Sequence, residues 1–139
     1  MSHQFVLASL GPDIAIRNYG MTQWETGNYI GTWSYGLPVA IGAPSIVGGY
    51  CATEDETIKQ ITIISEVAPP KLVKVNIWLK TAGVKDWYKT KFSIDVYEDI
   101  THKVIGLNLQ LGDRIAFELE ADIIWDLGQG GLTIYGIKD

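Results

Sequence analysis

From Glu54 onward, apolar and polar residues alternate along the chain with a period of two. For example, Val73, Val75 and Ile77 alternate with polar or charged neighbours. Such alternation is typical of β-strands that bury one face, whereas an amphipathic helix repeats every 3.6 residues. No window shows a helical period, and only residues 122–127 are a candidate for a single helical turn. The pattern therefore predicts an all-β protein.

The alternating segments are short and are separated by residues that favour turns, such as Thr81-Ala82-Gly83 and Gly112-Asp113. Short strands at intervals of roughly 10 to 15 residues favour a sandwich or a jelly roll. We therefore expect an antiparallel two-sheet jelly-roll sandwich with an extended N-terminal segment. The expected strands are residues 57–65, 73–80, 88–96, 105–111, 115–121 and 131–137, with 5–10 and 13–18 as candidates near the N-terminus.

The leading part of the chain has a different composition. Residues 1–53 carry only Asp13, Arg17 and Glu25 as charged side chains, and they are rich in glycine and large aromatic residues. We expect a leading segment, 1–47, and a jelly-roll domain, 48–139, that together form one structural unit. An uncharged aromatic segment of this kind indicates a contact surface, either with a partner or with the chain's own sheet. The residues expected to bind a partner are Phe5, Tyr19, Trp24, Trp33 and Tyr35.

Overall composition narrows the class of partner. Apolar residues make up 47% of the chain and charged residues 19%, against a typical charged share of about 25%. This balance favours an oligomer that buries part of its surface. The net charge is −5 with a pI near 4.9 and no basic stripe, which argues against a nucleic-acid partner. No run of about 18 apolar residues is present to span a membrane, and the N-terminus lacks the pattern of a secretory signal.

The residues that could carry catalysis are few and scattered. A nucleophile or general base needs partners within hydrogen-bond reach, and the pattern around His3 and His102 offers none. We expect both to be solvated, with His102 in a turn. Cys51 is expected to be a small buried hydrophobe, and Glu54-Asp55-Glu56 a solvated loop that lacks the spacing of a calcium site. The sequence therefore predicts a non-enzymatic protein with no metal site and no cofactor.

Tryptophan is frequent, with five in 139 residues. Aromatic side chains dominate protein interfaces, and their rings also stack on sugars. Trp78 falls among polar residues of its expected strand, and Trp125 lies between Asp122 and Asp126. These four residues are the candidate site for an alternative function, a carbohydrate-binding module or lectin.

The stretch VIGLNLQLGDRIAFEL, residues 104–119, is followed after a loop by GLTIYGI, residues 131–137. Together with Gly49-Tyr50 and the strand that includes Ile58–Ile64, this resembles the trimeric jelly rolls of the complement and tumour necrosis factor class and of phage receptor-binding heads. The resemblance covers residues 48–138. It implies a homotrimer whose apolar face packs around a three-fold axis, and capsid decoration proteins with N-terminal arms fit the same outline.

The resemblance and the charge-poor segment together predict a virion structural protein, either a capsid decoration protein or a receptor-binding fibre head. Its expected partners are further copies of itself and other virion proteins or a surface glycan. The expected location is the virion, with a cytoplasmic protein or one secreted without a signal peptide as the alternative. Fold resemblance alone does not establish function.

Overall fold

The structure is a computed structural model that describes residues 3–10, 15–17, 28–30, 50–85, 87–120, 124–126 and 129–138. Within these residues every regular element is a β-strand, as the alternating sequence predicts. The described part contains no helix that is long and apolar enough to cross a membrane. The strands are β1 (His3–Leu10), β2 (Ala15–Arg17), β3 (Asn28–Ile30), β4 (Tyr50–Cys51), β5 (Glu56–Ser65), β6 (Val73–Lys80), β7 (Tyr88–Val96), β8 (Ile100–Leu109), β9 (Arg114–Glu120), β10 (Ile124–Asp126) and β11 (Leu132–Lys138).

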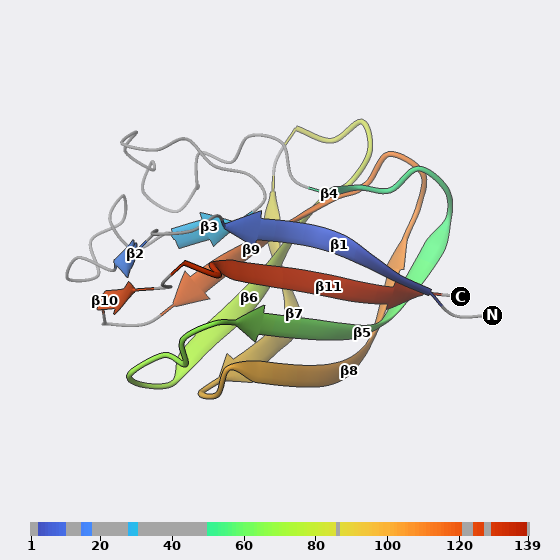
Figure 1. Cartoon of the computed structure of the whole chain (residues 1–139). Helices are drawn as coiled ribbons and strands as arrows, with labels where there is room; N and C mark the ends of the chain where they lie inside the picture. Colours follow the sequence, from blue (N-terminus) through green and yellow to red (C-terminus); the bar gives the residue numbers. More distant parts are fainter. Residues whose placement is uncertain are drawn as a thin grey trace.

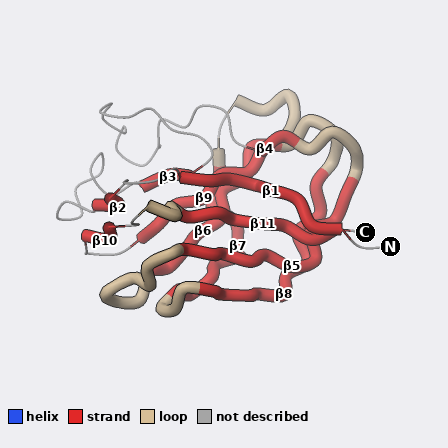
Figure 2. The backbone as a smooth tube through the Cα atoms, viewed as in Figure 1, coloured by secondary structure: helices blue, strands red, loops and turns tan. Residues whose placement is uncertain are grey.

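The strands form two main antiparallel sheets, which lie one behind the other in Figure 1. The four-stranded sheet has the order β1-β11-β5-β8, and the five-stranded sheet has the order β3-β9-β6-β7 with β4 also paired to β9. A small additional sheet pairs β10 with β2. Figure 2 shows that strand, drawn in red, makes up most of the described backbone. The predicted all-β character and the two antiparallel sheets are thus confirmed.

The core lies between the two main sheets and contains many of the residues predicted to face inward, although Leu111 and Tyr88, predicted on inward sides, are exposed. In β6, Val73, Val75 and Ile77 are all buried, because a strand's alternate side chains point to the same face. They belong to one apolar cluster with residues from β5 and β9, such as Ile61 and Phe117. This shared cluster holds the two sheets together, since burying an aliphatic or aromatic side chain contributes about 1.5–3 kcal/mol.

The predicted turn at Gly112-Asp113 joins several loops at one end of the sandwich. Gly112 has a φ of +92°, a conformation that favours glycine. The buried carboxylate of Asp113 accepts hydrogen bonds of 2.9 Å from the backbone N–H groups of Ala82 and Gln110. A carboxylate that satisfies backbone donors in this way stabilises the connections between strands.

The leading residues contribute an edge strand to the four-stranded sheet. β1 runs antiparallel to β11, with Phe5 opposite Gly136. A Cβ atom at Gly136 would lie 3.0 Å from Leu7 and 3.1 Å from Phe5. The glycine therefore allows the β1 side chains to pack closely over β11. Residues 5–10 of the leading segment were predicted to form a strand, and they do.

Three local predictions were wrong. Ile124–Asp126 forms strand β10, not part of a helical turn, because its backbone pairs with β2. His102 lies within strand β8, not in a turn, because β8 pairs with β5 along this stretch. Glu56 is not solvated as the rest of its acidic run is; its side chain is buried against Lys138.

Candidate functional site

The described residues contain no arrangement typical of catalysis. Among them, no group of three or more His, Cys, Asp or Glu side chains lies close enough to hold a metal ion. The ring of His102 contacts Thr62 and Gln60 through its Nδ1 atom, at 2.9 and 3.4 Å. The hydroxyl of Thr62 is buried, and neither neighbour is an acid that could orient the imidazole. We therefore searched the surface for a binding site.

The outward side of the four-stranded sheet carries no charged residue in its paired rows. Antiparallel register places residues from all four strands side by side on this surface. We call this surface the uncharged face. Its rows are Gln4–Ile137–Gln60–Val104, Val6–Tyr135–Thr62–His102 and Thr133–Ile64–Ile100.

The uncharged face has two apolar borders separated by a polar middle. Val104, on β8, is 78% exposed, and Ile100, at the start of the same strand, is exposed as well, as is its row partner Ile64 on β5. On the opposite border, Val6 of β1 is exposed as well. The middle holds the hydrogen-bonded Thr62, Gln60 and His102. Figure 1 looks onto this sheet, and no other described strand crosses in front of it.

Two lysines of β5 and β8 fall outside the paired rows. The register of β5 against β8 shifts between Ile58 and Gln60, and the exposed Lys59 lies at this irregularity, outside the rows. Lys103 pairs with the buried Ile61, so it belongs to the inward side of the edge strand. A one-residue shift moves every later side chain of a strand to the other face, and the bulge therefore decides which residues the face contains.

The outward side of the five-stranded sheet has the opposite character, and we call it the charged face. Register places Lys74 beside Asp95, and Asn76 beside Glu118. The carboxylate of Glu118 accepts hydrogen bonds from Asn76, at 3.0 Å, and from the indole N–H of Trp78, at 3.1 Å. This network joins β6 to β9, and it gives the buried Asn76 and the half-buried Trp78 a hydrogen-bond acceptor.

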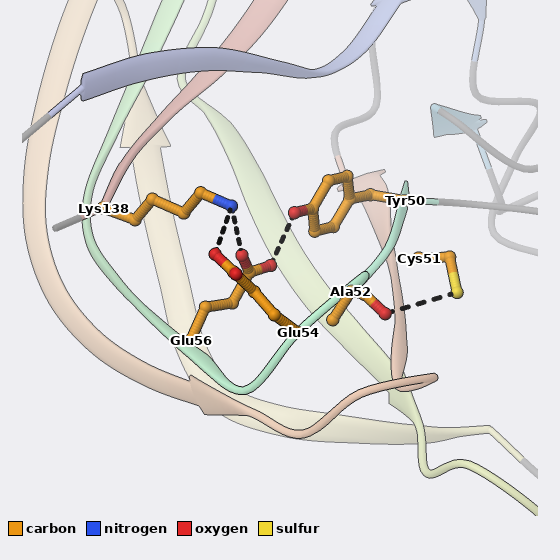
Figure 3. Close-up of polar contacts among 6 residues, drawn as sticks. All are labelled: Tyr50, Cys51, Ala52, Glu54, Glu56 and Lys138. Atoms are coloured by element: carbon orange, nitrogen blue, oxygen red, sulfur yellow. Dashed lines mark hydrogen bonds and ion pairs between the residues drawn. The ribbon is translucent and has the colours of Figure 1, made fainter.

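The four-stranded sheet keeps an ion pair at one end, on its inward side, shown in Figure 3. Glu56 of β5 accepts hydrogen bonds from Lys138 of β11 and, at 2.5 Å, from the hydroxyl of Tyr50. The side chains of Glu56 and Lys138 are 2% and 12% exposed. The exposed Glu54 lies 3.7 Å from the Lys138 ammonium. We call these residues the carboxylate clasp.

The clasp also includes a residue predicted to bind a partner. The ring of Phe5 lies 4.8 Å from the Lys138 ammonium and 5.3 Å from the ring of Tyr50. Burial and then the hydrogen bond to Glu56 raise the pKa of Tyr50. The hydrogen bond to Glu56 is also the main cause of the raised pKa of Lys138. The clasp therefore fastens β1, β4, β5 and β11 together.

Most of the other residues predicted to bind a partner or a glycan lie outside the described residues, namely Tyr19, Trp24, Trp33, Tyr35 and Asp122. The structure brings none of the described candidates together in one site.

The two tryptophans of the alternative glycan site differ in how exposed they are. Trp78 is half-buried on the charged face, and Trp125 is 1% exposed, donating its indole N–H to the carbonyl of Val67 at 2.9 Å. Asp126 belongs to β10 by its backbone. Glycan binding through Trp78, Trp125, Asp122 and Asp126 stays a prediction.

Sequence reasoning missed the uncharged face, although part of its signal was visible. In the last strand, the residues Thr133, Tyr135 and Ile137 alternate with the buried residues and include no charge. The missing information was which strands lie beside this one.

Comparison with family models, with curated proteins and with solved structures gives no match to this chain. What the protein does is therefore inferred from its own residues.

Proposed function

We propose that the sandwich is a jelly roll. A jelly roll arises when a long antiparallel hairpin of eight strands is rolled up. Numbering β1, β4, β5, β6, β7, β8, β9 and β11 from one to eight, the hairpin pairs are one with eight, two with seven, three with six and four with five. The observed pairs β1–β11, β4–β9, β5–β8 and β6–β7 follow this order. The rolled pairs β11–β5 and β9–β6 follow it as well.

As to function, the protein is a non-enzymatic assembly subunit that binds further copies of itself. The observation that carries this proposal is the uncharged face. The chain has a net charge of −5, so two copies repel each other over most approaches, but the paired rows of this face bring no charge to the contact, and the exposed Lys59 beside them adds no negative charge. Strands of ten residues, such as β5, set about 4.8 Å apart make a face of roughly 500 Å² in projection. Two such surfaces in contact would bury about 1,000 Å² in total, which is at the lower limit for a specific protein interface.

The two apolar borders of the face favour a head-to-tail contact. In this arrangement, the β8 border of one copy, with Val104, packs on the β1 border of the next, with Val6. Head-to-tail contacts form closed rings when the rotation between copies closes, and the proposed ring is a homotrimer. Viral capsid domains are among the proteins with a jelly-roll fold, so the proposed setting is a virion, as a capsid decoration or fibre-head subunit.

The test is the absolute mass of the protein in solution, measured by light scattering after size exclusion. The unaltered protein should have three times the 15.4 kDa mass of one chain. Val104→Asp should weaken association by about 100-fold or more, because it buries an unpaired charge in the contact. Val104 is largely exposed within one copy, so the fold of the variant should be intact by circular dichroism.

The matched control is Ser93→Asp, which adds the same charge to a strand of the charged face. This variant should keep the mass of the unaltered protein. A monomeric unaltered protein, or equal association by the two variants, would contradict the proposal.

A further inference from the structure

A cavity of about 360 Å³ lies beside the connection between β7 and β8. Within the described chain, β7 is an edge strand of the five-stranded sheet and β8 is an edge strand of the four-stranded sheet. The cavity therefore lies at an open side of the sandwich. Edge strands present backbone N–H and C=O groups that no neighbouring strand satisfies. The cavity's volume is near the lower end of the range of about 300–1,000 Å³ that small-molecule sites occupy.

One part of the cavity wall is apolar. Tyr97, at the bend between the two strands, is 64% exposed, and Ile100, at the start of β8, is 49% exposed. An exposed tyrosine beside an exposed isoleucine leaves apolar surface in water. A ligand that covered both side chains would remove this surface from water, at a gain of about 25 cal/mol for each Å².

The rest of the wall consists of hydrogen-bonding groups of several kinds. Asp95 and Glu98 supply carboxylate acceptors, Lys103 supplies an ammonium donor, and His102 supplies an imidazole. Within the described residues, Asp95, Glu98 and Lys103 make no ion pair or side-chain hydrogen bond. The hydroxyl of Tyr97 likewise has no partner there. These groups are therefore available to a ligand.

We propose that this cavity binds a pyranose ring of a glycan. A sugar ring has one face of C–H groups, which suits the ring of Tyr97, and a rim of hydroxyl groups that donate and accept hydrogen bonds. Carboxylates accept from such hydroxyls, and the lysine ammonium donates to them. Asp95, Glu98 and Lys103 together offer acceptors and a donor on one wall, which suits a ligand whose hydroxyl groups both donate and accept hydrogen bonds.

This site differs from the tryptophan site that the sequence predicts, and it can be tested separately from the proposed assembly. Ile100 and His102 line the cavity and also lie on the uncharged face, whereas Tyr97 and Glu98 belong to the cavity alone. The proposal adds ligand recognition to an assembly subunit.

The test is a titration of the full isotope-labelled chain with methyl glycosides of glucose, galactose, mannose and N-acetylglucosamine, followed by NMR. At least one sugar should cause saturable shifts in the backbone amides of residues 95–103. The expected Kd is of the order of 1 mM, the range for a ligand of this size in an open site. Saturable shifts confined to other residues, or none with any of the sugars, would overturn the proposal.

Tyr97→Ala should raise the Kd of that sugar by at least about tenfold, because it removes the stacking surface. The matched control is Tyr88→Ala, since Tyr88 is also an exposed tyrosine of β7 but lies outside the cavity wall. Equal affinity in the two variants would overturn the proposal. Tyr97→Ala should leave the solution mass unchanged, and Val104→Asp should leave the sugar affinity unchanged, so failure of either proposal is distinguishable from failure of the other.

Discussion

The two outer faces of the sandwich use their polar residues in opposite ways. The charged face places lysines beside acids and joins Asn76, Trp78 and Glu118 in one hydrogen-bonded network. The uncharged face has no charge in its rows and leaves Val104 and Val6 in water. A solvated sheet normally alternates apolar residues inside with polar residues outside. The uncharged face departs from that pattern, and this departure is why we assign it to assembly.

The four-stranded sheet places its charged residues Glu56 and Lys138 on its inward side, away from the uncharged face. In the four-stranded sheet, Glu56 and Lys138 turn toward each other on the inward side at one end. Their charges are satisfied within one copy and do not reach the uncharged face. A carboxylate that remained on that face would oppose contact between copies. The clasp thus stabilises the sheet while leaving its outer surface neutral.

The largest expected effect comes from a charge swap across the proposed contact. Val6→Lys alone should weaken association by about 100-fold, as Val104→Asp does, because each buries an unpaired charge. Val6→Lys combined with Val104→Asp should recover most of the association, since head-to-tail packing brings the two borders together. Light scattering over a dilution series measures both. A double variant as weak as the single variants would contradict the head-to-tail arrangement.

Breaking the carboxylate clasp should affect the stability of one copy. Lys138→Met leaves the buried Glu56 carboxylate without its cation, at an expected cost of about 2–4 kcal/mol in the free energy of unfolding. Urea denaturation followed by tryptophan fluorescence measures this cost. Lys85→Met, which removes an exposed lysine, is the control and should change stability by less than about 0.5 kcal/mol. Equal effects of the two variants would mean that the clasp contributes little.

A smaller effect is expected on the charged face. Trp78→Phe removes the indole N–H that donates to Glu118 at 3.1 Å, at a cost of about 1–2 kcal/mol. The solution mass should not change, because this face makes no contact between copies in our proposal. If Trp78→Phe lost association while the monomer remained folded, the contact between copies would involve the charged face, which would contradict our assignment of assembly to the uncharged face.

Alkaline pH should weaken the clasp gradually. The folded state raises the pKa of Tyr50 above its ordinary value of 10.0 and that of Lys138 above 10.5. Both groups therefore hold their protons more tightly when folded, so this stability is complete below about pH 10 and falls as the pH rises further. Urea denaturation between about pH 9 and pH 11 measures the fall. In Tyr50→Phe, the free energy of unfolding should decrease less steeply with rising pH. An identical decrease in the variant would show that Tyr50 does not contribute to this pH dependence.

Much of the fold could be predicted from local sequence. The alternation of Val73, Val75 and Ile77 identified the buried face of β6, because a strand has a side-chain period of two. The turn at Gly112-Asp113 was equally local. The helical turn predicted over residues 122–127 was wrong at residues 124–126, since pairing of β10 with β2, and not local propensity, determines the conformation of these three residues.

The candidate sites were much harder to predict, because each one joins distant parts of the chain. Glu56 and Lys138 lie far apart in sequence, and nothing in the run Glu54-Asp55-Glu56 distinguishes the residue that becomes buried. Nothing in the local sequence distinguishes Tyr97 or Glu98 as part of a site. Only the placement of β7 and β8 at neighbouring edges gives them a shared cavity.

The sequence by itself determined which residues can lie on the same side of each strand, because backbone geometry imposes that periodicity. The tertiary structure decided which strands became neighbours and in what register. The uncharged face depends on that second decision: Val6, Tyr135, Thr62 and His102 form one row only because β1, β11, β5 and β8 pair in that order. Such pairing depends on long-range packing of the whole core, which no single segment of the sequence encodes.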